Sequence, residues 1–360
     1  MTATTYSEFN LHTEGLEVAK AFSESIRGKT VLITGVNLRG LGFTTAQAFA
    51  SQSPAHLIIA SRTPSKIQEC IDALKQDYPD VDYRLLEIDL SKQKSVRAAA
   101  AEALSWDDIP IIDIVIFNGG TMGVQERTLT EDGIEMHLAT NHIGHFLLAN
   151  LIMPKVIKAA EANPVKGAAR IINVSSGSPR HSVMRWSDLR FETKSKDLPE
   201  SERPDYGFHR MTGCADPENH AYIPWEGYNQ SKVANLLFGI GLTRRVFERY
   251  GVLSLAVHPG VISTELGRHL PPEAFEVIGK MEKAGLISRK NLAAGSSTSL
   301  VAALDPKLGK SEDRGDKENW GAMLSDCQIW DEIRPLAISS SEAEKLWKVS
   351  EELVGEKFEY

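Results

Sequence analysis

Cysteine is scarce in this chain, and its scarcity removes several classes of protein. The 360 residues include only Cys70, Cys214 and Cys327, with no C-x-x-C pair and no nearby cluster of histidines. This spacing provides neither a disulfide framework nor the ligands of a zinc site. We therefore expect free thiols, no bound metal and a reducing, cytoplasmic location.

Long hydrophobic runs are also missing. No stretch of about 18 uninterrupted apolar residues occurs, so we expect no membrane-spanning helix. Residues 1–27 carry four glutamates and lack the basic start and apolar centre of a secretory signal. We interpret them as an amino-terminal extension of a protein that is not exported.

The chain has fewer positive than negative side chains, with 40 lysines and arginines and 48 aspartates and glutamates. Nucleic acids and anionic membranes attract clustered cations, so we expect neither as a partner. The chain also lacks internal repeats and Gly/Ser-rich linkers. With 42% hydrophobic and 24% charged residues, residues 1–360 are expected to form one domain around a large core.

What the chain does contain is a series of β-branched, apolar runs that alternate with helical patterns. The expected strands are residues 30–34, 56–61, 82–88, 112–117, 170–175 and 253–258. This alternation predicts an α/β fold, a doubly wound parallel sheet with helices on both faces. Ligands bind such sheets beyond the carboxyl ends of the strands. The residues expected there are Gly35, Arg62, Asp89, Asn118, Ser176 and Pro259.

A strand, a glycine turn and a helix follow one another near the amino end. A strand pattern precedes Gly35, and Gly40, Leu41 and Gly42 lead into a helical pattern over residues 43–50. Glycine permits close backbone approach, and a helix amino terminus offers free N–H groups to a pyrophosphate. The spacing differs from the G-x-G-x-x-G of the best-known dinucleotide fold. In its strand–turn–helix context we interpret it as a dinucleotide site.

The segment Tyr228-Asn-Gln-Ser-Lys232 places a phenol and an ammonium on one face of a helix. A nearby positive charge favours the phenolate, so Lys232 is expected to lower the pKa of Tyr228 toward neutrality. Tyr228 could then exchange a proton with an alcohol or a carbonyl. Most Tyr-Lys pairs at this spacing lie on solvated helix faces. The functional interpretation of this pair therefore depends on the glycine turn that precedes it in the chain.

Together the two motifs make the chain resemble the short-chain dehydrogenase/reductase family, in particular its retinol dehydrogenase and WW-domain oxidoreductase branch. The matching motifs are, in order, Thr34-Gly35 with Gly40 and Gly42, Asp89-Leu90, Asn118-Gly119-Gly120, Asn141, Ser176, Tyr228 with Lys232, and Pro259-Gly260 with Thr264. The resemblance covers about the whole chain. The departures are one extra residue between the first two glycines, Asn-Gly-Gly in place of Asn-Ala-Gly, and a long insertion before the tyrosine.

The resemblance implies a catalytic role for four residues. Tyr228 is expected to be the acid/base, and Lys232 to lower its pKa and bind the nicotinamide ribose. Ser176 is expected to hold the substrate oxygen, and the family register selects it over the neighbouring Ser175. Asn141 is expected to complete a water-linked proton path, and it can also satisfy a helix kink.

The choice of cofactor follows from charge. NAD presents a ribose hydroxyl to a carboxylate at the end of the second strand, whereas NADP carries a 2′-phosphate. That strand ends in Arg62 without Asp or Glu, and Arg39 precedes the second glycine. A single arginine is usually a solvated surface residue, but two at matched positions predict NADP(H). By resemblance, the other cofactor contacts are Asp89 and Leu90 at the adenine, Asn118 at the fourth strand end, and Val261 and Thr264 at the nicotinamide carboxamide.

An insertion of 51 residues, 177–227, is expected to form a pocket wall or lid. Its aromatic residues either provide apolar area for a bulky substrate or pack the insertion against the body. They are Trp186, Phe191, Tyr206, Phe208, Tyr222 and Trp225. A second candidate wall, residues 265–288, is expected to include a short helix with Leu270, Phe275, Ile278 and Met281.

Residues 9–26 and 346–354 show amphipathic helical patterns. Each helix could contact a second copy in a homo-oligomer or dock on its own body, and the sequence leaves the oligomeric state open. In the body of the chain, Ser91 is expected to cap the helix that runs through residues 97–104.

The expected function is an NADP(H)-dependent oxidoreductase that interconverts an alcohol and a carbonyl on a hydrophobic small molecule. Ketone or aldehyde reduction is favoured, and a place in secondary metabolism is left open. The alternative is a catalytically silent NADP-binding regulatory or scaffold protein of the same fold, whose expected mark is loss of a catalytic residue. A serine hydrolase would need G-x-S-x-G, and Ser175-Ser-Gly-Ser178 lacks the leading glycine.

Overall fold

A computed structural model describes residues 4–360 of the chain. Its centre is an eight-stranded sheet with the order β12-β11-β6-β5-β4-β1-β2-β3. The six expected strands are present as β1 (Thr30–Thr34), β2 (His56–Ser61), β3 (Asp82–Glu87), β4 (Ile114–Phe117), β5 (Arg170–Val174) and β6 (Leu253–His258). All neighbours among these six pair in parallel. The prediction of an α/β fold with a doubly wound parallel sheet is confirmed.

Short strands extend the sheet and form two small ribbons that the sequence did not reveal. β11 (Met323–Ser325) pairs with β6 in parallel, and β12 (Gln328–Ile329) returns antiparallel to β11. The ribbons are β7 (Val261–Ile262) with β8 (Arg289–Lys290), and β9 (Glu312–Arg314) with β10 (Lys317–Trp320). Most of these strands have only two or three residues, too few to show a strand pattern.

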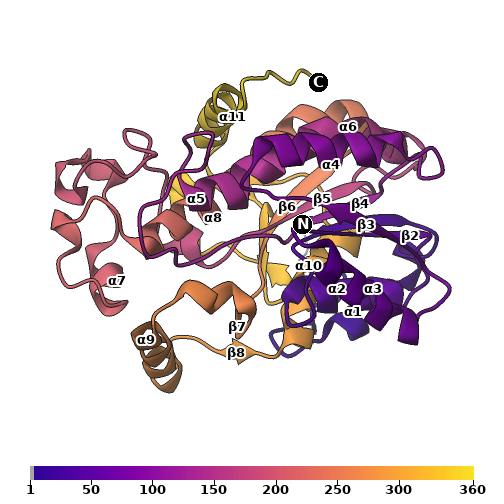
Figure 1. Cartoon of the computed structure of the whole chain (residues 1–360), viewed down its shortest axis with the longest axis horizontal. Coiled ribbons are helices and arrows are strands. Elements are labelled where there is room, and N and C mark those ends of the chain that lie inside the picture. Colours follow the sequence, from indigo (N-terminus) through magenta and orange to yellow (C-terminus); the bar gives the residue numbers. More distant parts are fainter. Residues whose placement is uncertain (1–3) are drawn as a thin grey trace.

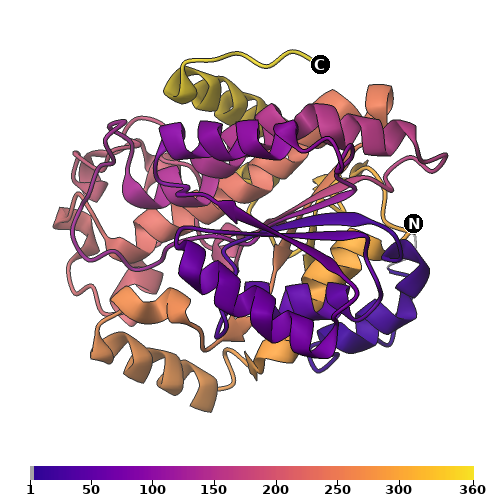
Figure 2. The same cartoon turned by 45° about the vertical axis from the view of Figure 1, so that its right-hand side comes forward.

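Helices cover both faces of the twisted sheet (Figures 1 and 2). One face carries α4 (Gln93–Ser105), α6 (Gly144–Glu161), α8 (Pro224–Tyr250) and α11 (Ser340–Val354). The other face carries α1 (Gly15–Ala21), α2 (Leu41–Ala50), α3 (Pro64–Asp77) and α10 (Leu292–Leu304). Alternate residues of a strand point to opposite faces, so Leu32 joins one buried cluster while Val31 and Ile33 join the other.

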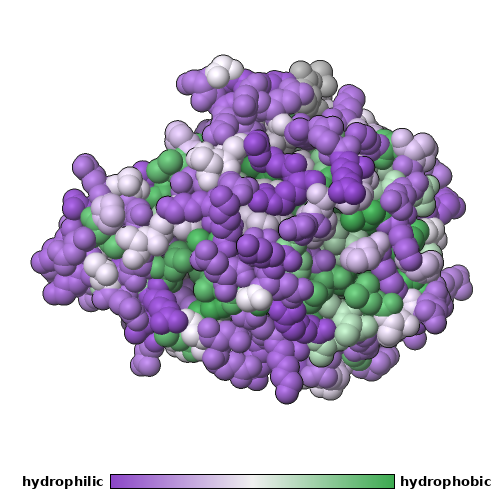
Figure 3. All heavy atoms as spheres, turned by 90° about the horizontal axis from the view of Figure 1, so that it is seen from above, coloured by the Kyte–Doolittle hydropathy of each residue, from purple (hydrophilic) through white to green (hydrophobic). Residues whose placement is uncertain are grey.

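One helical stretch in residues 4–360, Met136–Glu161, is long and apolar enough to cross a membrane. Inside the protein, 78% of its apolar window is buried, where α6 packs against α4 and α8. The face that carries these helices is mainly hydrophilic, with apolar side chains in patches between charged ones (Figure 3). Core packing therefore accounts for the apolar composition of this helix.

The expected helices near the two ends are present in shortened or extended form. α1 packs on α10 and α2, and α11 packs on α8. Each therefore docks on the body of its own chain. The expectation for Ser91 is wrong, because α4 begins at Gln93 after Lys92. Ser91 instead donates from its hydroxyl to Asp89 Oδ1 at 2.7 Å.

Two segments rise beside the carboxyl ends of the strands. The insertion, residues 177–227, contains α7 (Tyr206–Met211) and short 3-10 turns. The segment between β7 and β8 contains a 3-10 turn (Glu265–His269) and α9 (Pro272–Lys283). Both α7 and α9 lie on the left-hand side of the molecule in Figure 1, away from the helices that cover the sheet.

Candidate active site

The parallel strands end at one large cavity, whose volume is about 1690 Å³. Its walls come from the turns that follow all six parallel strands, from the insertion and from the segment between β7 and β8. The predicted site residues that line it are Gly35, Arg39, Gly40, Leu41, Arg62, Asp89, Leu90, Asn118, Ser176, Tyr228, Lys232, Val261 and Thr264. Gly42 and Asn141 are the two predicted residues that lie outside this lining.

The turn after β1 packs directly on the turn after β4. Gly35 has a φ of +72°, a conformation that favours glycine. A Cβ on Gly35 would lie 2.4 Å from the Cα of Gly119, so no larger residue fits. Asn118 Nδ2 donates to the carbonyls of Thr34 at 2.9 Å and Gly35 at 3.1 Å. These contacts fix the backbone of the turn that leads to Leu41, where α2 begins.

The other two glycines of the turn make room for asparagine side chains. A Cβ on Gly42 would lie 2.7 Å from Asn118 Nδ2, and one on Gly40 would lie 2.6 Å from Asn37 Nδ2. Asn37 lies in the stretch that is one residue longer than the family pattern. Its Oδ1 is buried and has no hydrogen-bond partner within residues 4–360. A free acceptor beside a helix amino terminus fits a polar ligand, such as a dinucleotide with ribose hydroxyls.

The part of the cavity where the sequence predicts adenine binding has a positive edge. Arg39 and Arg62 are exposed, line the cavity and form no salt bridge with other described residues. Asp89 lines the same cavity, and its carboxylate is held by the N–H of Ser91 at 3.1 Å and by the Ser91 hydroxyl. Two unpaired guanidinium groups at the ends of β1 and β2 fit a phosphate better than a ribose hydroxyl.

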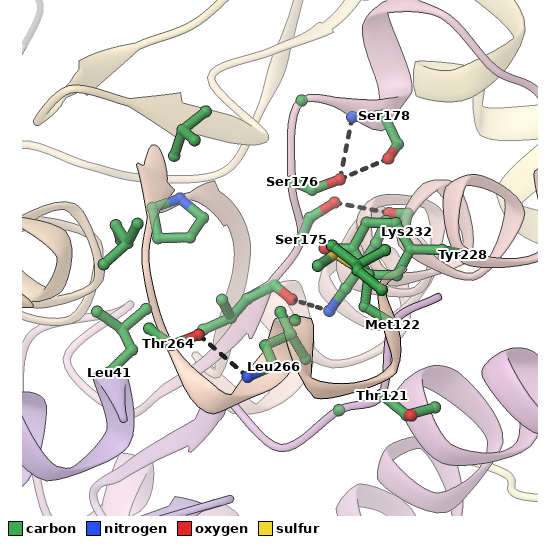
Figure 4. Close-up of a pocket in the computed structure, with 18 of the residues that line it drawn as sticks. Leu41, Thr121, Met122, Ser175, Ser176, Ser178, Tyr228, Lys232, Thr264 and Leu266 are labelled. Atoms are coloured by element: carbon green, nitrogen blue, oxygen red, sulfur yellow. Dashed lines mark hydrogen bonds between the residues drawn. The ribbon is translucent and has the colours of Figure 1, made fainter. Parts of the chain in front are cut away.

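Tyr228 and Lys232 lie on one face of α8, as their spacing predicts. Both are buried, and Lys232 Nζ lies 5.7 Å from the centre of the Tyr228 ring. Lys232 Nζ donates to the carbonyl of Val174 at 2.8 Å at the end of β5. Figure 4 shows the two side chains together at the cavity, beside Ser175 and Ser176.

The pKa of Tyr228 is shifted in the direction opposite to the one expected from the sequence. Burial raises the pKa of Tyr228 to about 12, and a hydrogen bond with Ser176 opposes this rise. The same burial lowers the pKa of Lys232 to about 7. Lys232 is therefore only partly charged near neutral pH, and desolvation outweighs its effect on the phenol. The prediction that Lys232 lowers the pKa of Tyr228 is wrong in this structure.

The two neighbouring serines have different partners. Ser175 Oγ donates to the backbone carbonyl of Lys232 at 2.6 Å and so ties β5 to α8. Ser176 Oγ accepts from the N–H of Ser178 at 3.0 Å and donates to the Ser178 hydroxyl at 2.6 Å. Ser178 in turn donates to Asn229 Oδ1 at 2.8 Å. Sequence reasoning missed this hydroxyl relay, although the Ser-Ser-Gly-Ser run was visible in the sequence.

Asn141 lies behind the cavity in a π-turn, Ala139–Ile143, at the start of α6. Its Oδ1 accepts from the N–H of Thr121 at 2.7 Å. Its Nδ2 donates to the carbonyl of Thr121 at 3.0 Å and to Ser231 Oγ at 2.8 Å. The side chain thus links the turn after β4 to α8, and none of these three bonds reaches the backbone of its own helix, so a role in satisfying the helix kink stays a prediction. The water-linked proton path stays a prediction.

The nicotinamide end of the predicted site is formed by the turn after β6. Val261 pairs with Arg289 in the β7–β8 ribbon. Thr264 Oγ1 accepts from the N–H of Leu266 at 3.2 Å, which starts the 3-10 turn that follows (Figure 4). These contacts fix the backbone on one side of the cavity, opposite Tyr228 and Ser176.

The insertion contributes both lining and packing side chains. Phe208 and Trp225 line the cavity, and Phe208 stacks on His181 with a centroid separation of 5.1 Å. Trp186 and Tyr222 instead donate hydrogen bonds to Glu342 Oε2 and the Val124 carbonyl. Apolar side chains complete the wall, namely Met122, Met136, Met211, Leu270, Phe275, Ile278 and Met281.

Metal ligation finds no support in the part of the chain that the structure describes. No three His, Cys, Asp or Glu side chains gather there as metal ligands would. The three cysteines are free thiols, as predicted.

Comparison with known proteins agrees with the geometry. The profile described as short chain dehydrogenase matches residues 29–188. Oxidoreductase fscI from Fusarium equiseti is 38% identical over 252 residues, which cover 70% of this chain and 94% of that protein. Retinol dehydrogenase 14 from Mus musculus is 33% identical over 343 residues, which cover 92% of this chain and 87% of that protein.

A solved structure extends the similarity to three dimensions. The crystal structure of a putative uncharacterized protein from Mycobacterium paratuberculosis has a TM-score of 0.58 and 26% identity to this chain. The match covers 93% of this chain and 96% of that one. With relatives above 30% identity over nearly the whole length, the chain belongs to the short-chain dehydrogenase/reductase family, as its motifs predicted.

Proposed function

We propose that this chain is an NADP(H)-dependent reductase of ketones or aldehydes on hydrophobic small molecules. The observation that carries the proposal is the buried phenol of Tyr228 beside Ser176 and Lys232 at the edge of the large cavity. A pKa of about 12 keeps the proton on Tyr228 near neutral pH, which is the state that a proton donor needs. Alcohol oxidation would need that proton removed first, so reduction is the favoured direction.

NADP(H) fits the residues of the cavity. The glycine turn and the start of α2 would hold the pyrophosphate, and Arg39 and Arg62 the 2′-phosphate. Asp89 and Leu90 would border the adenine, and Val261 and Thr264 the nicotinamide. When bound, the cofactor supplies the hydride that the side chains of this chain lack.

The side chains at the end of β5 and on α8 would handle the proton and the oxygen. Ser176 would turn its hydroxyl hydrogen from Ser178 to the substrate oxygen, while the N–H of Ser178 still holds the Ser176 Oγ in place. Tyr228 would give its proton to the same oxygen as negative charge develops there. The ammonium of Lys232 would stabilise the phenolate that is left behind.

The lining supports a bulky, apolar substrate. Phe208, Trp225 and the methionine side chains offer large, adaptable apolar surfaces around Tyr228. The insertion would thus act as a pocket wall, while part of it packs on the body. A cytoplasmic location and a role in secondary metabolism belong to this proposal as well.

The rival function is a silent protein that binds NADP(H) without turnover. Because Asn141, Ser176, Tyr228 and Lys232 are all retained and assembled, we favour the enzyme. Incubation with NADPH and a panel of apolar ketones and aldehydes tests both ideas, with cofactor oxidation and alcohol formation as readouts. Tight NADPH binding without oxidation across the panel would favour the silent protein, and no NADPH binding would overturn both.

Loss of Arg62 should change cofactor preference. Arg62→Gln removes one unpaired guanidinium from the proposed phosphate site, so the dissociation constant of NADPH should rise roughly tenfold or more. NADH lacks the 2′-phosphate and should bind with unchanged affinity. Fluorescence titration of both cofactors measures the effect. An equal effect on NADPH and NADH would contradict the assignment of NADP(H).

Substitution of each of the two adjacent serines should affect a different property, kcat in one case and the free energy of unfolding in the other. Ser176→Ala should lower kcat about 100-fold, since it removes a donor to the reacting oxygen. Ser175→Ala should keep kcat near the wild-type value and lower the free energy of unfolding by roughly 1–2 kcal/mol, because its partner carbonyl in α8 is buried. Steady-state kinetics and urea unfolding measure the two effects. The reverse pattern would assign the catalytic role to Ser175.

A further inference from the structure

The segment between β7 and β8, residues 263–288, is named the lid. It carries an arginine, Arg268, that has no salt-bridge partner among the described residues. Arg268 lies in the 3-10 turn Glu265–His269 and lines the cavity. Its Nη1 donates to the backbone carbonyl of Glu265 at 3.1 Å. The motifs of the sequence gave no role to this residue.

Arg268 belongs to a group of four cations around one part of the cavity. The other three are Arg39 in the glycine turn, Arg62 after β2 and Lys66 in the first turn of α3. None of the four forms a salt bridge with the residues that the structure describes. The chain has an excess of carboxylates, with a net charge of −8, and Asp89 and Glu265 line the same cavity, yet neither forms a salt bridge with these four cations. Clustered cations that lack acidic partners are typical of an anion site.

Arg268 is close enough to Arg62 for the two charges to repel each other. Burial and then the charge of Arg62 lower the pKa of the Arg268 guanidinium, while Glu265 acts in the opposite direction. Arg62 and Arg268 also lower the pKa of His269, after burial. The lid thus places Arg268 near Arg62, the residue that follows β2. A bound anion between Arg62 and Arg268 would remove this repulsion.

The lid is joined to the body by a narrow base and by one contact beside Arg268, where Gln125 Nε2 donates to the carbonyl of His269 at 3.1 Å. β7 and β8 pair through only two residues each, and Lys290 at this base forms a 2.6 Å ion pair with Asp326. Beyond the base, α9 turns Ile278 and Met281 toward the cavity, while Phe275 also lines it and is 50% exposed. An element attached in this way can be repositioned by one new contact at its positive end.

We propose that Arg268 is a third arginine for the 2′-phosphate of NADP(H), so that this phosphate, and not the rest of the dinucleotide, draws the lid onto the cavity. The proposal rests on the proposed function and goes beyond it. Arg39 and Arg62 lie on the body of the fold and select NADP(H) over NAD(H). Arg268 lies on the lid, which forms one wall of the substrate pocket. Its contact with the 2′-phosphate makes the position of the lid depend on which cofactor is bound. NADH would bind without fixing the lid.

A charge substitution on the lid tests the contact. Arg268→Gln should weaken NADPH binding roughly fivefold and leave NADH binding unchanged, because an exposed charge-assisted contact is lost. Lys280→Gln is the matched control, since Lys280 is also on the lid but does not line the cavity. If Arg62→Gln weakens NADPH binding while Arg268→Gln has no effect, the lid contact is wrong and the cofactor assignment stands. If neither variant discriminates NADPH from NADH, the cofactor assignment itself fails.

Proteolysis of the unaltered protein tests the coupling independently of turnover. Chymotrypsin should cleave the lid at the half-exposed Phe275. Saturating NADPH should slow this cleavage several-fold, and saturating NADH should slow it little. In Arg268→Gln the protection by saturating NADPH should fall to the level given by NADH. Equal protection by the two cofactors in the wild type would overturn the proposal.

Discussion

Tyr228→Phe should lose carbonyl reduction by about 10²–10⁴-fold in kcat, because no other proton donor replaces the phenol. NADPH binding should change little, since the hydroxyl is directed to the substrate oxygen and the ring is retained. The structure supports a loss in kcat and not in KM, because a neutral phenol acts mainly in the transition state. Steady-state kinetics and fluorescence titration of NADPH together measure the two effects.

A second tyrosine provides the matched control for this substitution. Tyr222 lies in the insertion and does not line the cavity, and its hydroxyl donates to the carbonyl of the lining residue Val124 at 2.6 Å. Tyr222→Phe should lower the free energy of unfolding by about 1 kcal/mol and leave kcat intact. Wild-type turnover in Tyr228→Phe would remove Tyr228 from the mechanism.

Lys232→Met should combine a loss of activity with a gain of stability. We expect kcat to fall by about 100-fold or more, because the phenolate formed on Tyr228 loses its positive neighbour. The buried ammonium destabilises the folded state, as its pKa of about 7 instead of 10.5 indicates. The carbonyl of Val174 stays paired in the variant, since Asn235 Nδ2 also donates to it at 3.1 Å.

The stability gain should depend on pH in a defined direction. Below pH 7 the lysine is charged in both folded and unfolded chains, and the wild type bears the full burial cost of a few kcal/mol. Between pH 7 and 10.5 the folded chain has released the proton while the unfolded chain keeps it, so wild-type stability rises. Lys232→Met should therefore exceed the wild type in Tm most at pH 6, and the difference should shrink toward pH 10.

Another buried lysine serves as the control. Lys155 Nζ donates to the carbonyls of Trp106 at 2.7 Å and Ile109 at 2.5 Å, away from the cavity. Lys155→Met should keep kcat but lose stability, because within residues 4–360 the carbonyl of Ile109 loses its donor and that of Trp106 keeps only the N–H of Ile109 at 3.3 Å. If Lys232→Met were less stable than the wild type at pH 6, the account of its buried charge would be wrong.

Local patterns were sufficient to predict the sheet and its binding edge. The six parallel strands have four to six residues each, are mainly apolar and are bounded by turn residues, so their pattern can be recognised in the sequence. Once they are parallel, their carboxyl ends must meet at one edge. This explains why Gly35, Asn118, Ser176 and Tyr228 converge on one cavity although they are far apart in the chain.

Properties that depend on tertiary burial could not be predicted in the same way. The spacing of Tyr228 and Lys232 gives their proximity, but the direction of each pKa depends on how much water the fold removes. The same holds for Asn141, whose three hydrogen bonds come from β4 and α8 neighbours that its own motif does not contain. Arg268 looks like an ordinary surface arginine until the lid brings it to Arg62.

The position of a bound nicotinamide relative to Tyr228 tests the central claim most directly. A crystal structure with NADP should place the nicotinamide C4 on the cavity side of Tyr228, about 3–5 Å from the site where Tyr228 Oη and Ser176 Oγ would hold a carbonyl group. Lys232 should lie against the adjoining ribose, and Arg62 against the 2′-phosphate. A nicotinamide ring bound outside this corner, or a Tyr228 hydroxyl turned away from it, would contradict the account.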